Sequence, residues 1–151
     1  LVANEIFEWV FDLSKKYKYY FIINPCQPFL NTDTINNFID TFLKSENKSI
    51  ITALKFKDFF WNENFELEKD KFMTSDFKNF IFNTRFVKQS YKASHGLQIG
   101  VIEELKKNYW MGTFKKGDPE LFFVEEEESF KIDSPWQFEM AELKYINQNK
   151  D

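Results

Sequence analysis

The residues whose types suit chemistry gather at three places in the sequence. They are the loop at residues 24–28 (Asn-Pro-Cys-Gln-Pro), the single histidine His95, and the acidic run at residues 125–128 with Lys131 and Asp133 behind it. The sequence has no Gly-rich phosphate loop, no Gly-x-Ser-x-Gly segment and no Cys/His set with zinc spacing. The usual carriers of covalent catalysis are therefore missing, and binding and electrostatics are left as the available chemistry.

Each of these candidates also has a purely structural interpretation. His95 can bind a ligand or serve as a hydrogen-bonded structural residue. Cys26 can be a nucleophile only with a base beside it, and is otherwise a small packing residue. The acidic run can gather a metal ion or form a solvated edge. Asp133 directly precedes a predicted helix start, so it can hold Mg²⁺ or complement the helix N-terminus.

The first candidate loop follows a predicted strand. Residues 19–23 are all apolar or aromatic, which is typical of a strand covered on both faces. Pro25 and Pro28 cannot donate ladder hydrogen bonds, so the strand must end at about Asn24. If the sheet is parallel, this loop lies at a carboxyl end, where open α/β sheets place their ligands.

A helix and a second strand follow this loop. Asn31 or Thr32 can cap a helix with an apolar stripe from Ile35 to Leu43, and residues 49–54 form the next strand. This spacing predicts a right-handed parallel crossover. We therefore expect a Rossmann-like three-layer α/β domain with a mainly parallel sheet. The strand at 19–23 should be central and parallel to the strand at 49–54.

The rest of the chain carries weaker signals. Residues 2–17 predict an amphipathic helix, and strands are expected at 97–102, 121–124 and 129–132, with residues 55–61 a further candidate. Residues 55–92 are rich in Phe and Trp but poorly periodic, which indicates a subunit interface or functional insertion, or else an ordinary surface insertion. Ser134-Pro-Trp-Gln137 is a capping box that starts the last helix. Its predicted buried face consists of Trp136, Met140, Ala141 and Leu143.

Composition excludes several classes of protein. The 151 residues suffice for one domain, and a net charge of −4 without a basic cluster disfavours nucleic-acid binding. No apolar run approaches the roughly 18 to 20 residues of a membrane span, and the N-terminus lacks the features of a signal peptide. The lone Cys26 fits a reducing compartment, so we expect a cytoplasmic protein that binds neither membrane nor nucleic acid.

Three stretches of the sequence resemble cytidylyltransferases of the acylneuraminate (CMP-sialic acid synthetase) type. Residues 23–30, Ile-Asn-Pro-Cys-Gln-Pro-Phe-Leu, are similar to the family's Leu-Gln-Pro-Thr-Ser-Pro-Leu-Arg after a core strand. Residues 91–99 resemble its Asn-Gly-Ala-Ile-Tyr-Ile strand, with Ser94 or His95 in place of the Asn. Residues 130–133, Phe-Lys-Ile-Asp, followed by Gln137-Phe138 and Ala141-Glu142, resemble its Ile-Asp-Ile-Asp segment and final helix. The three stretches keep the family's order and spacing.

The sequence also departs from the family. The Gly-rich Arg-x-Gly-Ser-Lys-Gly loop that grips the CTP phosphates is missing, so residues 1–151 correspond to the C-terminal two thirds of one nucleotidyltransferase domain, incomplete at the N-terminus. Lys131 stands where the family has the first carboxylate of a metal-binding pair. The loop's Gln, Thr, Ser and Arg are replaced by Asn24, Cys26, Gln27 and Leu30.

The resemblance implies transfer of CMP from CTP to a nonulosonic sugar acid, with Mg²⁺ as cofactor and a homodimer joined through residues 55–92. It implies that Asn24 and Lys131 act in catalysis and that Asp133 binds the metal. The implied substrate-binding residues are Asn24, Gln27, Arg85, Lys92 and His95. The chain alone should be inactive without the phosphate loop. The alternative is a catalytically silent relative that binds sugar or assists assembly, and Lys131 is the main argument for it.

Overall fold

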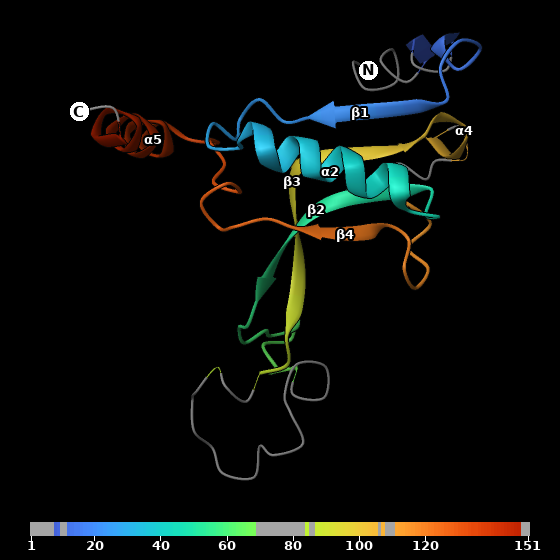
Figure 1. The fold of residues 1–151 in the computed structure, drawn as a ribbon. Coiled ribbons are helices and arrows are strands. Elements are labelled where there is room, and N and C mark those ends of the chain that lie inside the picture. The colour runs from blue at the N-terminus through green and yellow to red at the C-terminus, as the bar shows by residue number, and fades with distance from the viewer. Residues whose placement is uncertain are drawn as a thin grey trace.

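Four strands form one sheet in the order β1-β3-β2-β4 (Figure 1). The structure, a computed structural model, describes residues 8, 9, 12–68, 84, 87–105, 107 and 111–148. Its strands are β1 (Tyr19–Ile23), β2 (Ser49–Phe56), β3 (Ser90–Val101) and β4 (Glu120–Phe123). Its helices are α2 (Thr32–Lys44), α4 (Ile102–Leu105) and α5 (Pro135–Gln148). No helix in the described ranges has the length and apolar character needed to cross a membrane.

Three of the strands run in the same direction. β3 is antiparallel to both β1 and β2, and β2 is parallel to β4, so β1, β2 and β4 share one direction. The predicted parallel relation of residues 19–23 and 49–54 is therefore confirmed. The prediction that the first of them is central is wrong for the described sheet, because β3 lies between β1 and β2 and leaves β1 at an edge.

The core lies between the sheet and α2. Asn31 caps this helix as expected, since its Oδ1 accepts a hydrogen bond from the backbone N–H of Thr34 at 2.8 Å. Phe38 and Phe42 are buried against a sheet surface made by Ile50, Leu97 and Ile99. The Phe38 ring also contacts the rings of Phe21 from β1 and Phe122 from β4. Aromatic contacts from β1 and β4 and aliphatic contacts from β2 and β3 thus tie all four strands to α2.

A smaller cluster covers the amino end of β1 on the other side of the sheet. Tyr20, Ile102 and Leu105 are buried together, and Gln98 Nε2 donates to the Tyr20 hydroxyl at 2.9 Å. Burial raises the pKa of Tyr20 to about 12, although the Gln98 hydrogen bond opposes this shift. Tyr20 is therefore held as a neutral phenol.

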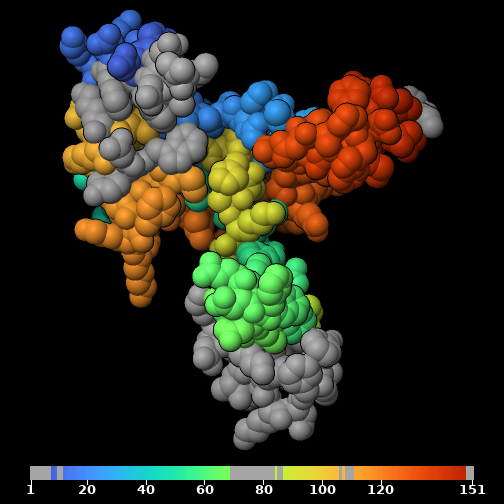
Figure 2. All heavy atoms as spheres, turned by 180° about the vertical axis from the view of Figure 1, so that it is seen from behind, coloured from blue at the N-terminus to red at the C-terminus, as the bar shows by residue number. Residues whose placement is uncertain are grey.

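The last helix begins where predicted but is not buried as predicted. Ser134 Oγ donates to Gln137 Oε1 at 2.9 Å, and Gln137 Oε1 also accepts from the backbone N–H of Asp133. Of the expected buried face only Ala141 is buried. Trp136 is 60% exposed, and Met140 and Leu143 are also more than half exposed. The reason is that α5 projects from one end of the sheet instead of lying on a face (Figures 1 and 2).

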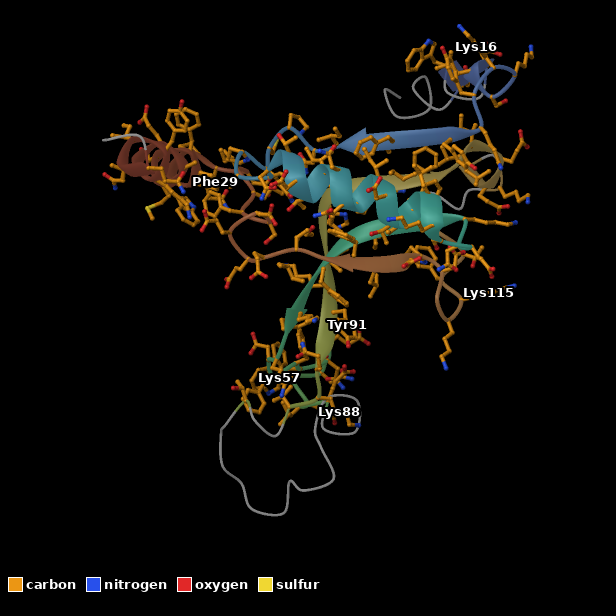
Figure 3. The ribbon with its side chains drawn as sticks, in the orientation of Figure 1. Lys16, Phe29, Lys57, Lys88, Tyr91 and Lys115 are labelled. Atoms are coloured by element: carbon orange, nitrogen blue, oxygen red, sulfur yellow. The ribbon has the colours of Figure 1, made fainter. Side chains whose placement is uncertain are left out.

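β2 and β3 continue past the sheet as a two-stranded arm (Figure 1). The arm pairs residues 53–56 with residues 90–93, and Lys57, Lys88 and Tyr91 mark it in Figure 3. β2 ends at Phe56, so the candidate strand at 55–61 is mostly wrong. The predicted strand at 129–132 is wrong too, because these residues form a turn and a loop that lies against residues 24–31.

Candidate functional site

The three stretches singled out in the sequence meet at one edge of the sheet. β1, β2 and β4 present their carboxyl ends there, and antiparallel β3 enters at the same edge. The backbone N–H of Asn24 donates to Gly96 O at 2.8 Å, and that of Ile132 donates to Cys26 O at 2.9 Å. The loop at 24–28 is therefore hydrogen-bonded directly both to the His95 region and to residues 130–133.

The loop after β1 is held in shape by its own side chains. Asn24 Oδ1 accepts from the backbone N–H of Cys26 at 3.0 Å, which forms an Asx turn of the kind that commonly opens a loop. Farther along, Asn31 donates to the Glu128 carboxylate and the Phe29 ring contacts the Phe130 ring. These contacts fasten the loop to the segment that carries Lys131 and Asp133.

The side chain of Gln27 points from this loop into the interior. It is buried, and Nε2 donates to the backbone carbonyl of Ser94 at 2.5 Å. Oε1 has no hydrogen-bond partner among the described residues and faces Gly96, where an added Cβ would lie 2.2 Å away. Only glycine at position 96 allows Gln27 Oε1 to approach the backbone of β3 this closely. Through this approach and its hydrogen bond to Ser94 O, Gln27 links the loop to β3.

β3 bulges where it passes Gln27. Ile51 pairs with Gln98 and Ala53 pairs with Ala93, so Thr52 alone stands opposite the four residues 94–97. His95 lies in this bulge with a left-handed backbone, φ 58°. A non-glycine residue in that region is uncommon and is maintained only by its surroundings.

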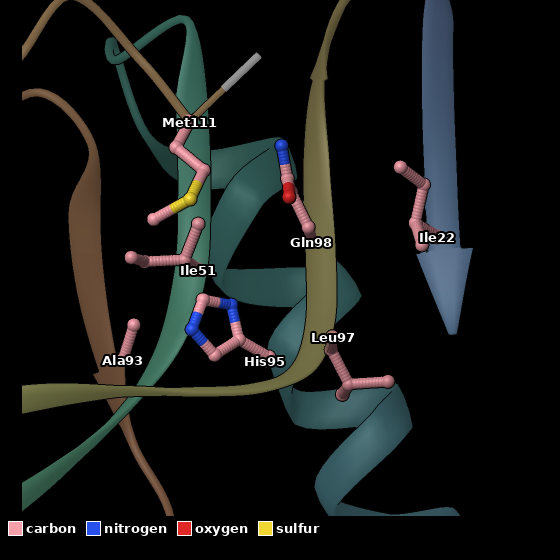
Figure 4. A pocket seen from close by; sticks show the side chains of 7 residues that line it. All are labelled: Ile22, Ile51, Ala93, His95, Leu97, Gln98 and Met111. Carbon is pink, nitrogen blue, oxygen red and sulfur yellow. The ribbon is translucent and has the colours of Figure 1, made fainter. Parts of the chain in front are cut away.

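The bulge directs His95 into a small pocket of about 50 Å³ (Figure 4). Ile22 of β1, Ile51 of β2, and Gln98 and Met111 also line it. The His95 ring lies beside Ile51, with Gln98 and Met111 farther along the same side of the sheet. The pocket therefore combines an apolar floor with an imidazole and an amide, and at this volume it can take only one edge of a ligand.

Lys131 and Asp133 form an ion pair beside the loop at residues 24–28. Their Nζ and Oδ1 atoms are 2.9 Å apart, and both side chains are well exposed. The hydrogen bond to Asp133 and then its charge raise the pKa of Lys131 above the usual value, with a small further effect from Cys26. Lys131 thus carries a stable positive charge close to the loop.

These residues do not by themselves fit a Mg²⁺ site. Mg²⁺ prefers several oxygen ligands in near-octahedral geometry. The one carboxylate at this position, Asp133, is already bonded to an ammonium group. Within the part of the chain that the structure describes, no group of three His, Cys, Asp or Glu side chains is arranged to hold a metal ion.

The remaining candidates lie apart from this edge or make other contacts. Lys92 is exposed on the arm, opposite Leu54. Arg85 falls outside the described residues. Two members of the acidic run bind neighbouring elements, since Glu127 pairs with Lys144 of α5 at 2.6 Å and Glu128 accepts from Asn31. The edge thus brings together Asn24, Gln27, His95, Lys131 and Asp133.

Sequence reasoning missed Thr52, and it named Ser94 only as an alternative to His95 for the family's Asn. Both side chains are buried at the bulge and hydrogen-bonded to each other, with Ser94 Oγ donating to Thr52 Oγ1 at 2.7 Å. A usable signal was present, because Thr52 is a hydroxyl in the middle of a strand otherwise suited to full burial.

Comparison with known proteins gives a result at the level of the fold. No protein-family model and no curated protein matches the chain. Among solved structures, it resembles the 4-diphosphocytidyl-2C-methyl-D-erythritol synthase from Anaerococcus prevotii DSM 20548, with a TM-score of 0.60 and 17% sequence identity. The match covers 93% of this chain and 64% of that enzyme. The chain therefore has the predicted Rossmann-like α/β fold, and it spans about 64% of the length of a synthase that shares this fold.

Proposed function

We propose that the polypeptide containing this chain transfers CMP from CTP to a nonulosonic, sialic-acid-like sugar acid. One observation carries the proposal: of the three stretches that resemble acylneuraminate cytidylyltransferases, the first is hydrogen-bonded to each of the other two at the carboxyl end of the sheet. The similar solved structure is that of a 4-diphosphocytidyl-2C-methyl-D-erythritol synthase, which supports a cytidine nucleotide as the donor. The lone Cys26 thiol is consistent with action in the reducing cytoplasm.

In this reaction the anomeric hydroxyl oxygen of the sugar acid attacks the α-phosphorus of CTP. A new oxygen–phosphorus bond forms, the bond between the α-phosphorus and pyrophosphate breaks, and the hydroxyl proton passes to solvent. The protein need not supply a nucleophile, because this chemistry depends on positioning and charge stabilisation. The absence of covalent machinery in the sequence is therefore no obstacle.

The residues at the edge suit these tasks. Asn24 Oδ1 is engaged by Cys26, which leaves the amide NH₂ as the group to contact sugar or nucleotide. His95 meets the substrate in the pocket, while Gln27 acts from below by holding the loop against Ser94. Lys92 and Arg85, from residues 55–92, are proposed to reach the sugar carboxylate.

The Lys131 ammonium is proposed to contact a phosphate of CTP, with Asp133 holding it in place. An ammonium can stabilise phosphate charge as a point cation. Mg²⁺ belongs to the proposal only as an ion that arrives with the nucleotide phosphates, because Asp133 is the sole carboxylate at this position and is paired with Lys131. No step depends on it here.

A homodimer is proposed through the arm. Trp61 is 55% exposed and Phe65 is 89% exposed near its end, where they contribute little to the core of one subunit. Large exposed rings on a projecting element are characteristic of subunit interfaces. The second subunit would cover them.

A catalytically silent sugar-binding or assembly module is the second candidate. The Lys131–Asp133 ion pair favours it, because the carboxylate expected to bind metal is already neutralised. Both candidates need the same fold and the same pocket, so activity must distinguish them.

The test is pyrophosphate release by the full-length polypeptide with CTP and a panel of nonulosonic acids, run with Mg²⁺ and with chelator. Release that depends on both substrates supports the transferase. Saturable sugar-acid binding without release, on protein that includes the phosphate loop, would establish the silent module instead. The 151-residue chain is the matched control, and it should release no pyrophosphate.

A further inference from the structure

Thr52 is a buried hydroxyl placed where the sheet is irregular. Its side chain is fully buried in β2, between Ile51 and Ala53. A hydroxyl in such a place costs roughly 1–3 kcal/mol unless it is hydrogen-bonded. Valine has nearly the same shape and would fill the site without that cost. The presence of the hydroxyl therefore requires an explanation.

The hydroxyl replaces the strand pairing that the bulge in β3 removes. Thr52 Oγ1 accepts hydrogen bonds from the backbone N–H groups of Gly96 and Leu97 at 3.1 and 3.0 Å, and from Ser94 Oγ at 2.7 Å. It also donates to Leu97 O at 3.3 Å. These groups flank His95 on both sides. The bulge is thus fastened at its centre by one side chain.

The bulge in turn determines where His95 lies. Gly96 and Leu97 are fixed by Thr52, and the Ser94 carbonyl is fixed by Gln27. The residue between these anchors adopts φ 58° and directs its ring into the pocket beside Ile51. Without the anchors, a regular strand would turn the side chain to another direction.

We infer that Thr52 is a positioning residue: through the bulge at residues 94–97 it sets the orientation in which His95 meets the bound nucleotide or sugar acid. The inference rests on the proposed function only for the identity of the ligand. The geometry of the bulge is independent of that function. Its chemistry is that of a neutral hydroxyl acting on backbone amides, with no contact to substrate.

His95 is the sole histidine of these 151 residues, and its signals can be followed by NMR. In the full-length polypeptide, selective labelling of histidine at Cε1 and at the backbone nitrogen gives one ring signal and one backbone signal for each histidine, and the pair that disappears in His95→Gln belongs to His95. The proteins compared are the full-length polypeptide, Thr52→Val and Thr52→Ser. Thr41→Val is the matched control, since Thr41 donates only to Asn37 O within α2. CMP is the ligand probe.

Thr52→Val should shift both His95 signals and weaken CMP or sugar-acid binding on the order of tenfold, because misplaced contacts lose affinity steeply. Thr52→Ser keeps the hydroxyl and should restore both. Thr41→Val should change neither. Where Thr52→Val does not fold, Ser94→Ala removes one of the same hydrogen bonds and should give a smaller shift in the same direction.

Two outcomes separate this inference from the proposed function. If Thr52→Val moves the His95 signals while wild-type protein shows no response to CMP or to sugar acids, the positioning role stands and the proposed ligand fails. If Thr52→Val, or Ser94→Ala in its place, leaves the His95 signals and ligand affinity unchanged, the positioning role is overturned.

Discussion

Gly96→Ala is expected to destabilise the protein through a specific clash with Gln27. The ideal Cβ would lie 2.2 Å from Gln27 Oε1 and 3.2 Å from its Cδ, whereas ordinary contact begins at 3.4 Å. The amide must therefore retreat by about 1.2 Å. It is buried and anchored to Ser94 O, so this retreat strains or breaks a buried hydrogen bond.

The magnitude follows from the two effects together. Overpacking a well-filled site costs about 1–3 kcal/mol, and loss of a neutral hydrogen bond adds about 1 kcal/mol. We expect Gly96→Ala to lower the free energy of unfolding by about 2–4 kcal/mol. Urea denaturation of the full-length polypeptide, followed by circular dichroism, measures this difference.

A double-mutant cycle tests the reasoning itself. Gln27→Ala removes both clashing atoms, so adding Gly96→Ala to it should cost much less than in the wild type, with a coupling of about 1–3 kcal/mol. Gly117→Ala is the control, because no atom lies within 4 Å of its Cβ and its φ of +86° leaves only backbone strain. Its cost should be independent of Gln27. Strict additivity of Gly96→Ala and Gln27→Ala would refute the clash.

Three further predictions concern other parts of the molecule. Folding raises the pKa of Tyr20 from its ordinary value of 10.0 to about 12, so the contribution of this phenol to stability is full below pH 10.0 and is lost as the pH rises through 12. Tyr20→Phe should therefore remove about 3 kcal/mol of destabilisation at alkaline pH, measured as the change in urea midpoint between those two pH values. Lys131→Ala should strongly lower CMP transfer by the full-length enzyme, because it removes the charge proposed to meet a CTP phosphate, and Asp133→Ala should lower it less, because it only releases that charge from its partner. Full activity of both variants with unchanged Mg²⁺ dependence would reduce this pair to a structural role. Phe65→Glu should shift the mass measured by light scattering from dimer toward monomer. Phe114→Glu is the control and should not, because Phe114 is also exposed and also has a positive φ, 57°, but lies outside the arm. A monomeric wild-type protein at high micromolar concentration would contradict the dimer.

The elements that sequence predicted well have local causes. The prolines after Asn24 end β1, the Asn31 side chain caps α2, and Ser134 with Gln137 starts α5. In each case the determining atoms lie within a few residues of the boundary. The approximate bounds of these elements could therefore be predicted without knowledge of the fold.

The errors concern what lies beside each element. The apolar pattern of residues 19–23 indicates a strand but contains no information on which strand pairs with it, so the insertion of β3 was not predicted. Periodicity in α5 predicts an apolar face, but whether that face is covered depends on where the helix points. The bulge opposite Thr52 arises only when β2 and β3 pair. Such information is non-local.

The candidate site shows the same division. The resemblance aligns Lys131 and Asp133 with the two members of a metal-binding pair; their side chains do meet, at 2.9 Å, although the segment is a loop and not the predicted strand. The proximity of residues 23–30 and 130–133 could be anticipated only from the resemblance to a family. The contacts that hold His95 in place could not, because Thr52 and Gln27 are distant from it in sequence.

The site separates neutral groups from charged ones by depth. Gln27 and Thr52 are buried, neutral and bonded to backbone atoms, while Lys131 and Asp133 form an exposed ion pair. Burying a charge at the deeper positions would cost several kcal/mol per ion, whereas a hydrogen-bonded hydroxyl, or an amide that keeps one hydrogen bond, costs far less. Rigid, neutral, buried groups together with an exposed pair of charges suit a reaction that needs fixed geometry and charges that can meet phosphate. It follows that substitutions of Gln27 or Thr52 should reduce stability and ligand affinity together, whereas substitutions of Lys131 or Asp133 should reduce affinity alone.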